Sequence, residues 1–228
     1  MNIWAVVPVK ELDRAKERLA PLLPPALRRT LMVAMLEDVL SALIATQALT
    51  GLAIVTVEPE ARRLAAKYGA RVIEIGARDG HTGAVAAAAQ ILAAEGAHGM
   101  LTVPGDVPLV TADEIAQLLA AHRPAPAFTI APSHDERGSN AVLCSPPDAV
   151  PLRFGEDSFF PHLEAAESRG IRPTVLRLPG IALDIDTPKD LAAFAVRRSP
   201  TRARAFLAAN KLLQPLEPAA APTGDRWG

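Results

Sequence analysis

Two segments far apart in the chain each place aspartate where an apolar run ends. The first is Leu101–Asp106, and the second is Leu183–Asp186, which carries Asp184 as well as Asp186. We expect both to be strand ends, which would deliver carboxylate oxygens to the rim of a parallel sheet, where α/β proteins bind ligands. Mg²⁺ prefers oxygen ligands and commonly takes only one or two protein carboxylates, with phosphate oxygens and water completing its shell. The pattern therefore predicts Mg²⁺ held by Asp106, Asp184 and Asp186, and chemistry on a phosphorylated nucleotide.

The loop after the first apolar run is rich in cations. Lys10 follows that run directly, and Lys16 and Arg18 come shortly after it. Lysine offers a compact charge and arginine a bidentate donor, so such a loop can hold a polyphosphate. The alternative is a solvent-exposed helix in which Asp13, Glu17 and the basic residues pair at helical spacing. Because the loop faces the Asp106 strand end, we favour Lys10 and Lys16 as catalytic cations.

Two further segments, 133–140 and 153–159, combine glycine with hydroxyl or amide side chains. Glycine permits close approach of the backbone to a ligand, and a helix that begins near Ser158 would aim free N–H groups at an anion. Arg153 would add a charge-assisted contact. A turn followed by an ordinary helix cap is the commoner meaning of such short pieces. Together with the aspartates, however, they predict a second phosphate subsite.

Short β-branched runs alternate with longer Ala/Leu-rich stretches along the chain, which is the pattern of repeated βα units. We expect strands at 3–9, 52–57, 71–75, 100–103, 127–131, 140–144 and 174–178, and a short strand that ends at 184–186. We expect helices that begin at residues 25, 59, 84, 112, 158 and 188. The fold class is therefore α/β, with a mostly parallel sheet flanked by helices. A single domain would span 1–212 and a mobile Pro/Ala-rich tail 213–228.

Composition limits the classes of partner. Half of the 228 residues are hydrophobic, which is enough for one sizeable core. The 24 Lys and Arg residues are balanced by 25 Asp and Glu residues. The net charge therefore argues against binding to duplex nucleic acid or to an anionic membrane, because either would need a strongly basic protein. No signal sequence and no apolar stretch of bilayer length is present, so we expect a cytoplasmic protein. A homodimer is compatible with the sequence, which leaves the oligomeric state open.

The cysteine and the histidines carry no predicted chemistry. The single Cys144 excludes an internal disulfide and a site of several thiolates, and we expect it to be buried. We expect His98, His122 and His162 on helix or loop surfaces, without a catalytic role.

Several motifs together resemble one family. They are PVK at 8–10, AKERL at 15–19, PGDVPLVT at 104–111, SNAVL at 139–143, RFGEDSF at 153–159 and LDIDTPKDL at 183–191. From about Ile3 to Phe194 the chain is similar to the 2-phospholactate, phosphoenolpyruvate or 3-phosphoglycerate guanylyltransferases, which make a deazaflavin coenzyme of the F-420 type. The resemblance implies a single GT-A-like domain that transfers GMP from GTP to the phosphate of a small acid and releases pyrophosphate.

The resemblance also implies residue roles. The metal-binding acids match Asp106, Asp184 and Asp186, the contacts to the acceptor phosphate match Asn140, Gly155 and Ser158, and the lysines of the nucleotide loop match Lys10 and Lys16. Arg18 and Arg153 would be further substrate contacts.

The chain departs from the family pattern at one point. Where the family usually has a Leu-Asn pair, this chain reads His81-Thr82-Gly83. A short hydroxyl cannot supply the paired donor and acceptor of an amide. We therefore expect GTP to be preferred over other nucleotides with weaker discrimination than the family pattern implies.

Two other functions stay open. A GT-A-type glycosyltransferase would also use a nucleotide and an aspartate-held metal, and Asp184-Ile185-Asp186 has the D-x-D form. A diverged nucleotide-binding protein without turnover would explain His81-Thr82-Gly83. Release of pyrophosphate from GTP indicates nucleotidyl transfer, whereas release of a nucleoside diphosphate from a nucleotide sugar indicates glycosyl transfer. The identity of the acceptor acid cannot be read from the sequence.

Overall fold

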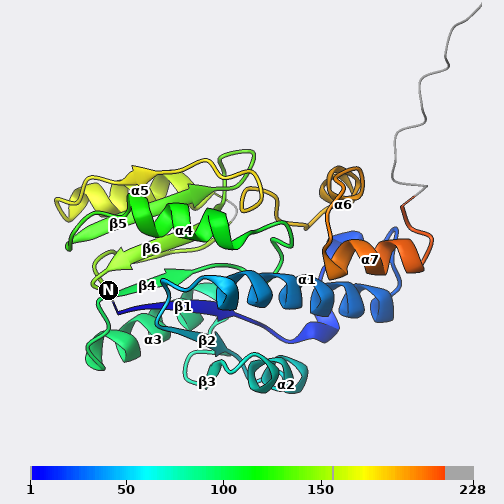
Figure 1. The fold of residues 1–228 in the computed structure, drawn as a ribbon, viewed down its shortest axis with the longest axis horizontal. Coiled ribbons are helices and arrows are strands. Elements are labelled where there is room, and N and C mark those ends of the chain that lie inside the picture. The colour runs from blue at the N-terminus through cyan, green and yellow to red at the C-terminus, as the bar shows by residue number, and fades with distance from the viewer. Residues whose placement is uncertain (1, 156, 214–228) are drawn as a thin grey trace, which may run out of the picture.

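One mixed sheet of seven strands runs through the centre of the protein, in the order β3-β2-β1-β4-β6-β5-β7 (Figure 1). The structure is a computed structural model, and it describes residues 2–155 and 157–213. The strands are β1 (Ile3–Pro8), β2 (Gly51–Val55), β3 (Arg71–Ile73), β4 (Gly99–Thr102), β5 (Ala127–Pro132), β6 (Ser139–Ser145) and β7 (Thr174–Val175). All neighbouring pairs are parallel except those of β6, which runs antiparallel to both β4 and β5. The predicted α/β class with a mostly parallel sheet is confirmed.

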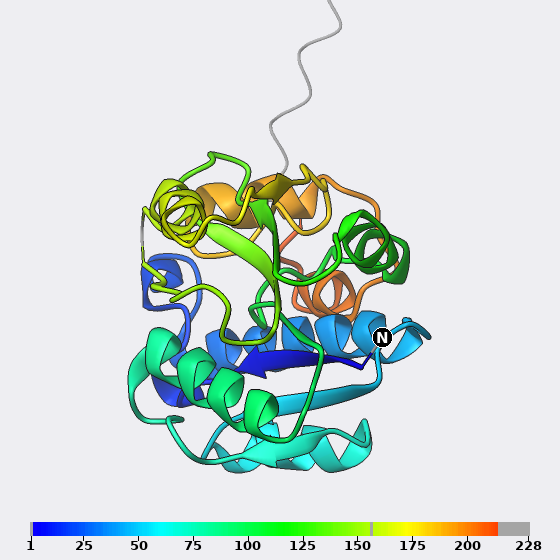
Figure 2. The ribbon, with the colours of Figure 1, turned by 90° about the vertical axis from the view of Figure 1, so that its left-hand side faces the viewer.

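Helices cover both faces of the sheet (Figure 2). They are α1 (Pro25–Ala45), α2 (Pro59–Lys67), α3 (Gly80–Ala94), α4 (Ala112–Ala121), α5 (Phe159–Ser168), α6 (Pro188–Ala195) and α7 (Arg202–Ala209). Alternation along β1 separates the faces: Ala5 and Val7 pack into the core with α1, whereas Val6 packs into the core with α3. Within the described part of the chain, no helix has the length and apolar character needed to cross a bilayer. A cytoplasmic location stays a prediction.

Three helices begin where the sequence predicts, because proline occupies their first turn at positions 25, 59 and 188. Thr187 also caps α6 in a reciprocal pair with Asp190. Helix α3 begins at Gly80, four residues earlier than predicted, so His81-Thr82-Gly83 forms its first turn. Helix α7 was not predicted. The predicted tail, 213–228, lies outside the described residues apart from its first residue.

Two groups of predictions are wrong. The segment 183–186 is not a strand. Leu183 and Ile185 are buried, whereas Asp184 and Asp186 are only partly buried. This alternation of buried and exposed positions is that of a strand, but the segment pairs with no strand of the described sheet. Likewise, His122 and His162 are buried. Cys144 is buried as predicted, and burial raises the pKa of its thiol to about 12.

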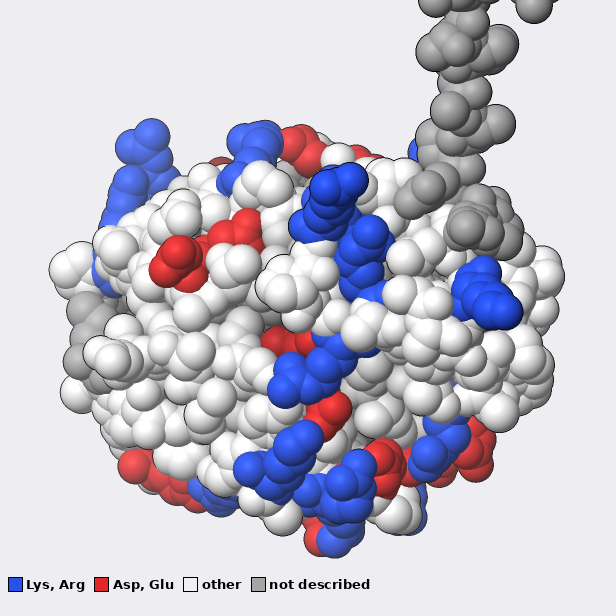
Figure 3. All heavy atoms as spheres, turned by 45° about the vertical axis from the view of Figure 1, so that its right-hand side comes forward, with Lys and Arg blue, Asp and Glu red and all other residues white. Residues whose placement is uncertain are grey.

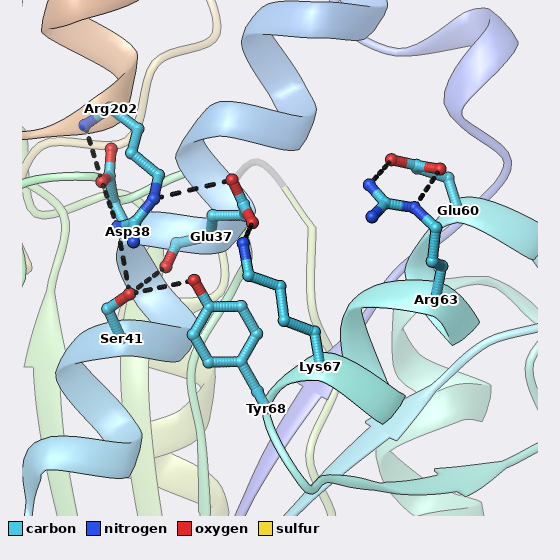
Figure 4. Close-up of polar contacts among 8 residues, drawn as sticks. All are labelled: Glu37, Asp38, Ser41, Glu60, Arg63, Lys67, Tyr68 and Arg202. Atoms are coloured by element: carbon cyan, nitrogen blue, oxygen red, sulfur yellow. Dashed lines mark hydrogen bonds and ion pairs between the residues drawn. The ribbon is translucent and has the colours of Figure 1, made fainter.

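Helix α7 is held on α1 by a buried carboxylate (Figure 4). Asp38 accepts hydrogen bonds from the backbone N–H groups of Arg202, at 2.8 Å, and Ala203, at 2.9 Å. These are N–H groups of the first helical turn, which have no partner within the helix. Burial raises the pKa of Asp38, and these hydrogen bonds offset part of that rise. Asp38 therefore acts as a distant cap that orders the last described helix.

We expect Asp38→Ala to lower the free energy of unfolding by about 2–3 kcal/mol, because two buried N–H groups lose their acceptor. Urea unfolding followed by circular dichroism measures the change. Glu60→Ala is the control, since the hydrogen bonds of the Glu60 carboxylate in the described part of the chain go to the neighbouring exposed Arg63 (Figure 4), and such pairs contribute little. Equal effects of the two substitutions would contradict the capping role of Asp38.

Candidate active site

Strand order brings the predicted site residues to one edge of the sheet. β1 is parallel to β4, with Val6 opposite Thr102, so the residues that follow each strand emerge at the same edge. Lys10 follows β1 and Asp106 follows β4. β6 runs the other way, with Val142 opposite Thr102, so its first residues lie at that edge too.

Two hollows open along this edge. The N-loop cavity, about 820 Å³, lies between residues 8–17, the end of β2 and the start of α3. The hairpin cavity, about 750 Å³, is lined by residues of the β5–β6 hairpin, of the loop that leads into α5 and of the segment 184–190. Both cavities are lined by Lys10, Gly80, His81, Pro104, Asp106 and Asp186. They therefore meet at a junction that holds two carboxylates and one lysine.

One face of the molecule carries a local concentration of positive charge. In the view of Figure 3, Lys and Arg side chains form a band across the middle of the molecule, with Asp and Glu atoms between them. The net charge of −1 thus conceals a local concentration of cations. A band of this kind suits anionic ligands.

Lys16 joins the first loop to both aspartate segments. Its ammonium donates to Asp106 Oδ2 and to Asp186 Oδ1, the latter at 2.5 Å, and its side chain is only 6% exposed. Burial alone would lower the pKa of Lys16, but the charges of Asp106 and Asp186 outweigh it and raise the pKa. In the same way burial would raise the pKa of Asp186, and the charge of Lys16 outweighs it. Lys16 and Asp186 therefore stay ionised at neutral pH.

Asp184 lies beside this cluster and is held by Asn140. The Asn140 amide donates to Asp184 Oδ1 and to the carbonyl of Ile181, both at 3.0 Å. Burial raises the pKa of Asp184, the bond from Asn140 lowers it, and the nearby Asp106 and Asp186 raise it further. The amide N–H groups of Asn140 thus position the segment 181–184, and Asn140 also lines the hairpin cavity. Its predicted contact to the acceptor phosphate stays a prediction.

The donor set fits Mg²⁺. Among the described residues, no group of three or more His, Cys, Asp or Glu side chains is arranged to hold a metal. Two carboxylates, those of Asp106 and Asp186, nevertheless converge on one cation, the Lys16 ammonium. The other oxygen of Asp106, Oδ1, is buried and has no hydrogen-bond partner among the described residues. Two carboxylates suffice for Mg²⁺ when phosphate oxygens complete its shell.

The remaining predicted residues fall into two groups. Lys10 lines both cavities, and Arg18, Gly155 and Ser158 line the hairpin cavity. Arg153 is not among the described residues that line either cavity, and its backbone N–H donates to His162 Nε2 at 2.8 Å. The structure thus connects Arg153 to the buried His162, and the predicted substrate contact of Arg153 stays a prediction.

The start of α5 offers fewer N–H groups than predicted. The N–H of Phe159 donates to the carbonyl of Arg137 at 3.0 Å, and the third helical residue is Pro161, which has no N–H. The helix terminus alone is therefore a weaker anion site than the sequence suggested.

Residues 81–83 pack against the loop that leads into α5. The His81 ring stacks on Phe154 with a centroid separation of 4.3 Å, and Thr82 Oγ1 accepts from the Phe154 N–H at 3.0 Å. Burial lowers the pKa of His81 to about 4, so the ring is neutral. Thr82 thus supports the loop that carries Gly155. Sequence reasoning missed this contact, because nothing local relates two segments 72 residues apart.

The two aspartate-bearing loops are also packed backbone against backbone. The N–H of Ile185 donates to the Asp106 carbonyl at 3.0 Å, and the N–H of Gly180 donates to Glu114 Oε1 at 2.7 Å. A Cβ atom at Gly180 would overlap Leu109 O and Glu114 Oε2. Glycine at 180 therefore permits the close approach that sets the separation of Asp106 from Asp184 and Asp186.

The model of the family described as "Guanylyl transferase CofC like" matches residues 3–226. This chain belongs to that family. The resemblance seen in the motifs is confirmed, and the protein is an enzyme of the nucleotidyltransferase class.

Three relatives carry more specific names. A phosphoenolpyruvate guanylyltransferase of Sphaerobacter thermophilus is 39% identical, over 86% of this chain and 93% of its own. A 3-phospho-D-glycerate guanylyltransferase of Colwellia psychrerythraea is 35% identical, over 88% and 94%. A 2-phospho-L-lactate guanylyltransferase of Methanothermobacter thermautotrophicus is 31% identical, over 91% and 90%.

Solved structures share the fold at low identity. A candidate nucleotide-diphospho-sugar transferase of Desulfovibrio desulfuricans G20 superposes with a TM-score of 0.74 at 18% identity, covering 93% of this chain and 97% of its own. A nucleotidyl transferase of Methanothermobacter thermautotrophicus gives a TM-score of 0.59 at 16% identity, with 92% and 99% covered. These similarities support the GT-A-like fold of this guanylyl transferase.

We expect Gly180→Ala to lower the free energy of unfolding by about 1–3 kcal/mol and to reduce kcat, because the new methyl group forces the two aspartate loops apart. Urea unfolding and steady-state kinetics measure the two effects. Gly155→Ala is the control for stability, since a Cβ at that position lies within 4 Å of no atom of the described residues beyond its chain neighbours. If Gly180→Ala were as stable as Gly155→Ala, the close packing of the loops would not set the site.

Proposed function

We propose that this guanylyl transferase transfers GMP from GTP to the phosphate of a small phosphorylated carboxylic acid and releases pyrophosphate. The observation that carries the proposal is the junction of two cavities at Lys10, Asp106 and Asp186. Two anionic substrates could each occupy one cavity and meet at this junction. The names of the relatives supply the acceptor class: phosphoenolpyruvate, 3-phosphoglycerate or 2-phospholactate. The product would serve the synthesis of a deazaflavin coenzyme of the F-420 type.

We place GTP in the N-loop cavity and the acid in the hairpin cavity. Val9, Val55 and Val57 give the N-loop cavity an apolar wall that suits a flat base, and Lys10 stands at its junction end. The hairpin cavity is lined mainly by polar and charged groups, which include the hydroxyls of Ser139 and Ser158. Such a lining suits a small molecule with a phosphate and a carboxylate.

The proposed reaction is an in-line displacement at the α-phosphorus of GTP. An oxygen of the acceptor phosphate is already an anionic nucleophile, so no Ser, Cys or His needs to be activated. Its bond to the α-phosphorus forms while the bond to pyrophosphate breaks. Lys10 and Lys16 offset the charge that develops on the leaving pyrophosphate.

Asp106 and Asp186 would hold Mg²⁺, with Asp184 beside them. When bound, the ion would neutralise phosphate charge and orient the two anions. The same carboxylates pair with the Lys16 ammonium. Lys16 therefore has two roles in the proposal, as the partner of the carboxylates and as a cation for the phosphates.

The test is a pyrophosphate-release assay that crosses GTP, ATP, CTP and UTP with the three acids. We expect release with GTP and one preferred acid, and weaker release with the other nucleotides. Release from no combination would contradict the proposal. Release of a nucleoside diphosphate from a nucleotide sugar would instead support the glycosyltransferase alternative.

We expect Asp106→Asn to keep the fold and to lower kcat by about 10²–10³-fold, because it removes one charge from the junction with almost no change in shape. The pyrophosphate-release rate over a Mg²⁺ series measures this loss. Asp113→Asn, on the exposed first turn of α4 and outside both cavities, is the matched control. A normal rate with unchanged Mg²⁺ dependence would remove Asp106 from the site.

We expect Gly155→Val to raise the KM of the acid at least tenfold while the KM of GTP changes little. The side chain at 155 would project into open space at the hairpin cavity, so it would fill the cavity without straining the fold. Initial rates with each substrate varied in turn give the two constants. A larger effect on GTP would reverse the assignment of the two cavities.

A further inference from the structure

A buried histidine lies behind the hairpin cavity with its protonation state fixed by the backbone. His162 on α5 is 1% exposed, and its Nε2 accepts the backbone N–H of Arg153 at 2.8 Å. A backbone N–H can only donate, so Nε2 carries a lone pair and the ring proton of the neutral imidazole sits on Nδ1. Burial lowers the pKa of His162 to about 4, so the ring is neutral at physiological pH. Phe154 packs against the ring edge-on at 5.0 Å.

This tautomer decides how Ser139 hydrogen-bonds. His162 Nδ1 lies 2.9 Å from Ser139 Oγ and must donate to it. Ser158 Oγ also donates to Ser139 Oγ, at 3.2 Å. A hydroxyl oxygen has two acceptor positions, and both are now used. Ser139 can then make one more hydrogen bond, by donating its O–H proton. No described residue accepts that proton.

The β-sheet turns the Ser139 side chain toward α5, at the wall of the hairpin cavity. Along the β5–β6 pair, Pro132 lies opposite Ser139 and Ala131 opposite Ala141, so Asn140 is an extra residue in a β-bulge. A bulge breaks the alternation of side chains between the two faces. Ser139 therefore meets α5, whereas its neighbour Asn140 meets the segment 181–184. Ser139 is 7% exposed and lines the hairpin cavity.

We propose that His162 is a positioning residue that, through Ser139, presents a fixed hydroxyl donor to an anionic oxygen of the acceptor acid. The inference rests on the proposed function, because it assigns the acceptor to the hairpin cavity. A hydroxyl that can only donate favours a phosphate or carboxylate oxygen and disfavours a ligand group that must itself donate. Ser139 would thus add a donor beside Asn140, which also lines the hairpin cavity.

The test compares KM values for phosphoenolpyruvate, 3-phosphoglycerate or 2-phospholactate, whichever the wild type uses, with KM values for GTP. We expect Ser139→Ala and His162→Phe each to raise the acceptor KM about 10- to 100-fold, the usual effect of losing a hydrogen bond to a charged group. The KM for GTP should change less than about twofold. His162→Asn should recover part of the acceptor affinity, since its amide can still donate toward Ser139.

Two comparisons separate positioning from a merely structural effect. If His162 acts through Ser139, the double variant Ser139→Ala/His162→Phe should bind the acceptor no more weakly than Ser139→Ala alone. His122→Phe is the matched control, because His122 is also a buried neutral histidine that bonds two hydroxyls, those of Thr129 and Ser145, but it lines neither cavity. It should lower stability and leave the acceptor KM unchanged.

An unchanged acceptor KM in Ser139→Ala would overturn the inference, and this test does not depend on how well His162→Phe folds. Additive losses in the double variant would overturn the link between the two residues. Failure of the wild type to use any of the three acids would overturn the proposed function itself. If the wild type turns over one of the acids and the variants keep its acceptor KM, the inference about Ser139 and His162 would be overturned and the proposed function would stand.

Discussion

The candidate site depends on the ion pairs that Lys16 makes with Asp106 and Asp186. The two carboxylates come from loops 80 residues apart, and without a cation between them their charges would repel across the junction of the cavities. Lys16 has a left-handed backbone with φ of 55°, which costs a non-glycine residue about 1–2 kcal/mol. The ion pairs therefore fix the first loop in an otherwise unfavourable conformation.

The rest of the structure holds those groups at a set distance. Gly180 and Leu109 bring the aspartate-bearing loops into contact, and Glu114 bonds the N–H of Gly180. Asn140 fixes Asp184 from the other side, and the α6 cap begins one residue after Asp186. Because these supports come from separate elements, the carboxylates do not depend on one flexible loop. The two cavities then differ in chemistry while sharing the same charged boundary.

Much of the fold follows from local sequence. Apolar runs predicted all seven strands within a few residues, and proline or threonine marked the starts of several helices. The proximity of Lys10 and Asp106 followed from parallel strands alone. The segment 183–186 was harder, because buried and partly buried residues alternate there as in a strand. Its partners, however, are the Asp106 carbonyl in the loop after β4 and the Asn140 amide in β6. The register shift that turns Ser139 toward α5 likewise depends on pairing with β5. The burial of His162 did leave a signal, since it lies three residues after the buried Phe159 and four before the buried Ala166, on one helical face.

The central claim is that two substrates meet directly at the junction, without a guanylylated enzyme between them. The stereochemical course at the α-phosphorus tests it most directly, with GTP that carries sulfur in one configuration at that phosphorus as the donor. A single in-line displacement predicts inversion, which ³¹P nuclear magnetic resonance of the product with the preferred acid would detect. Retention would require two displacements and a covalent intermediate on the protein, and it would contradict the account.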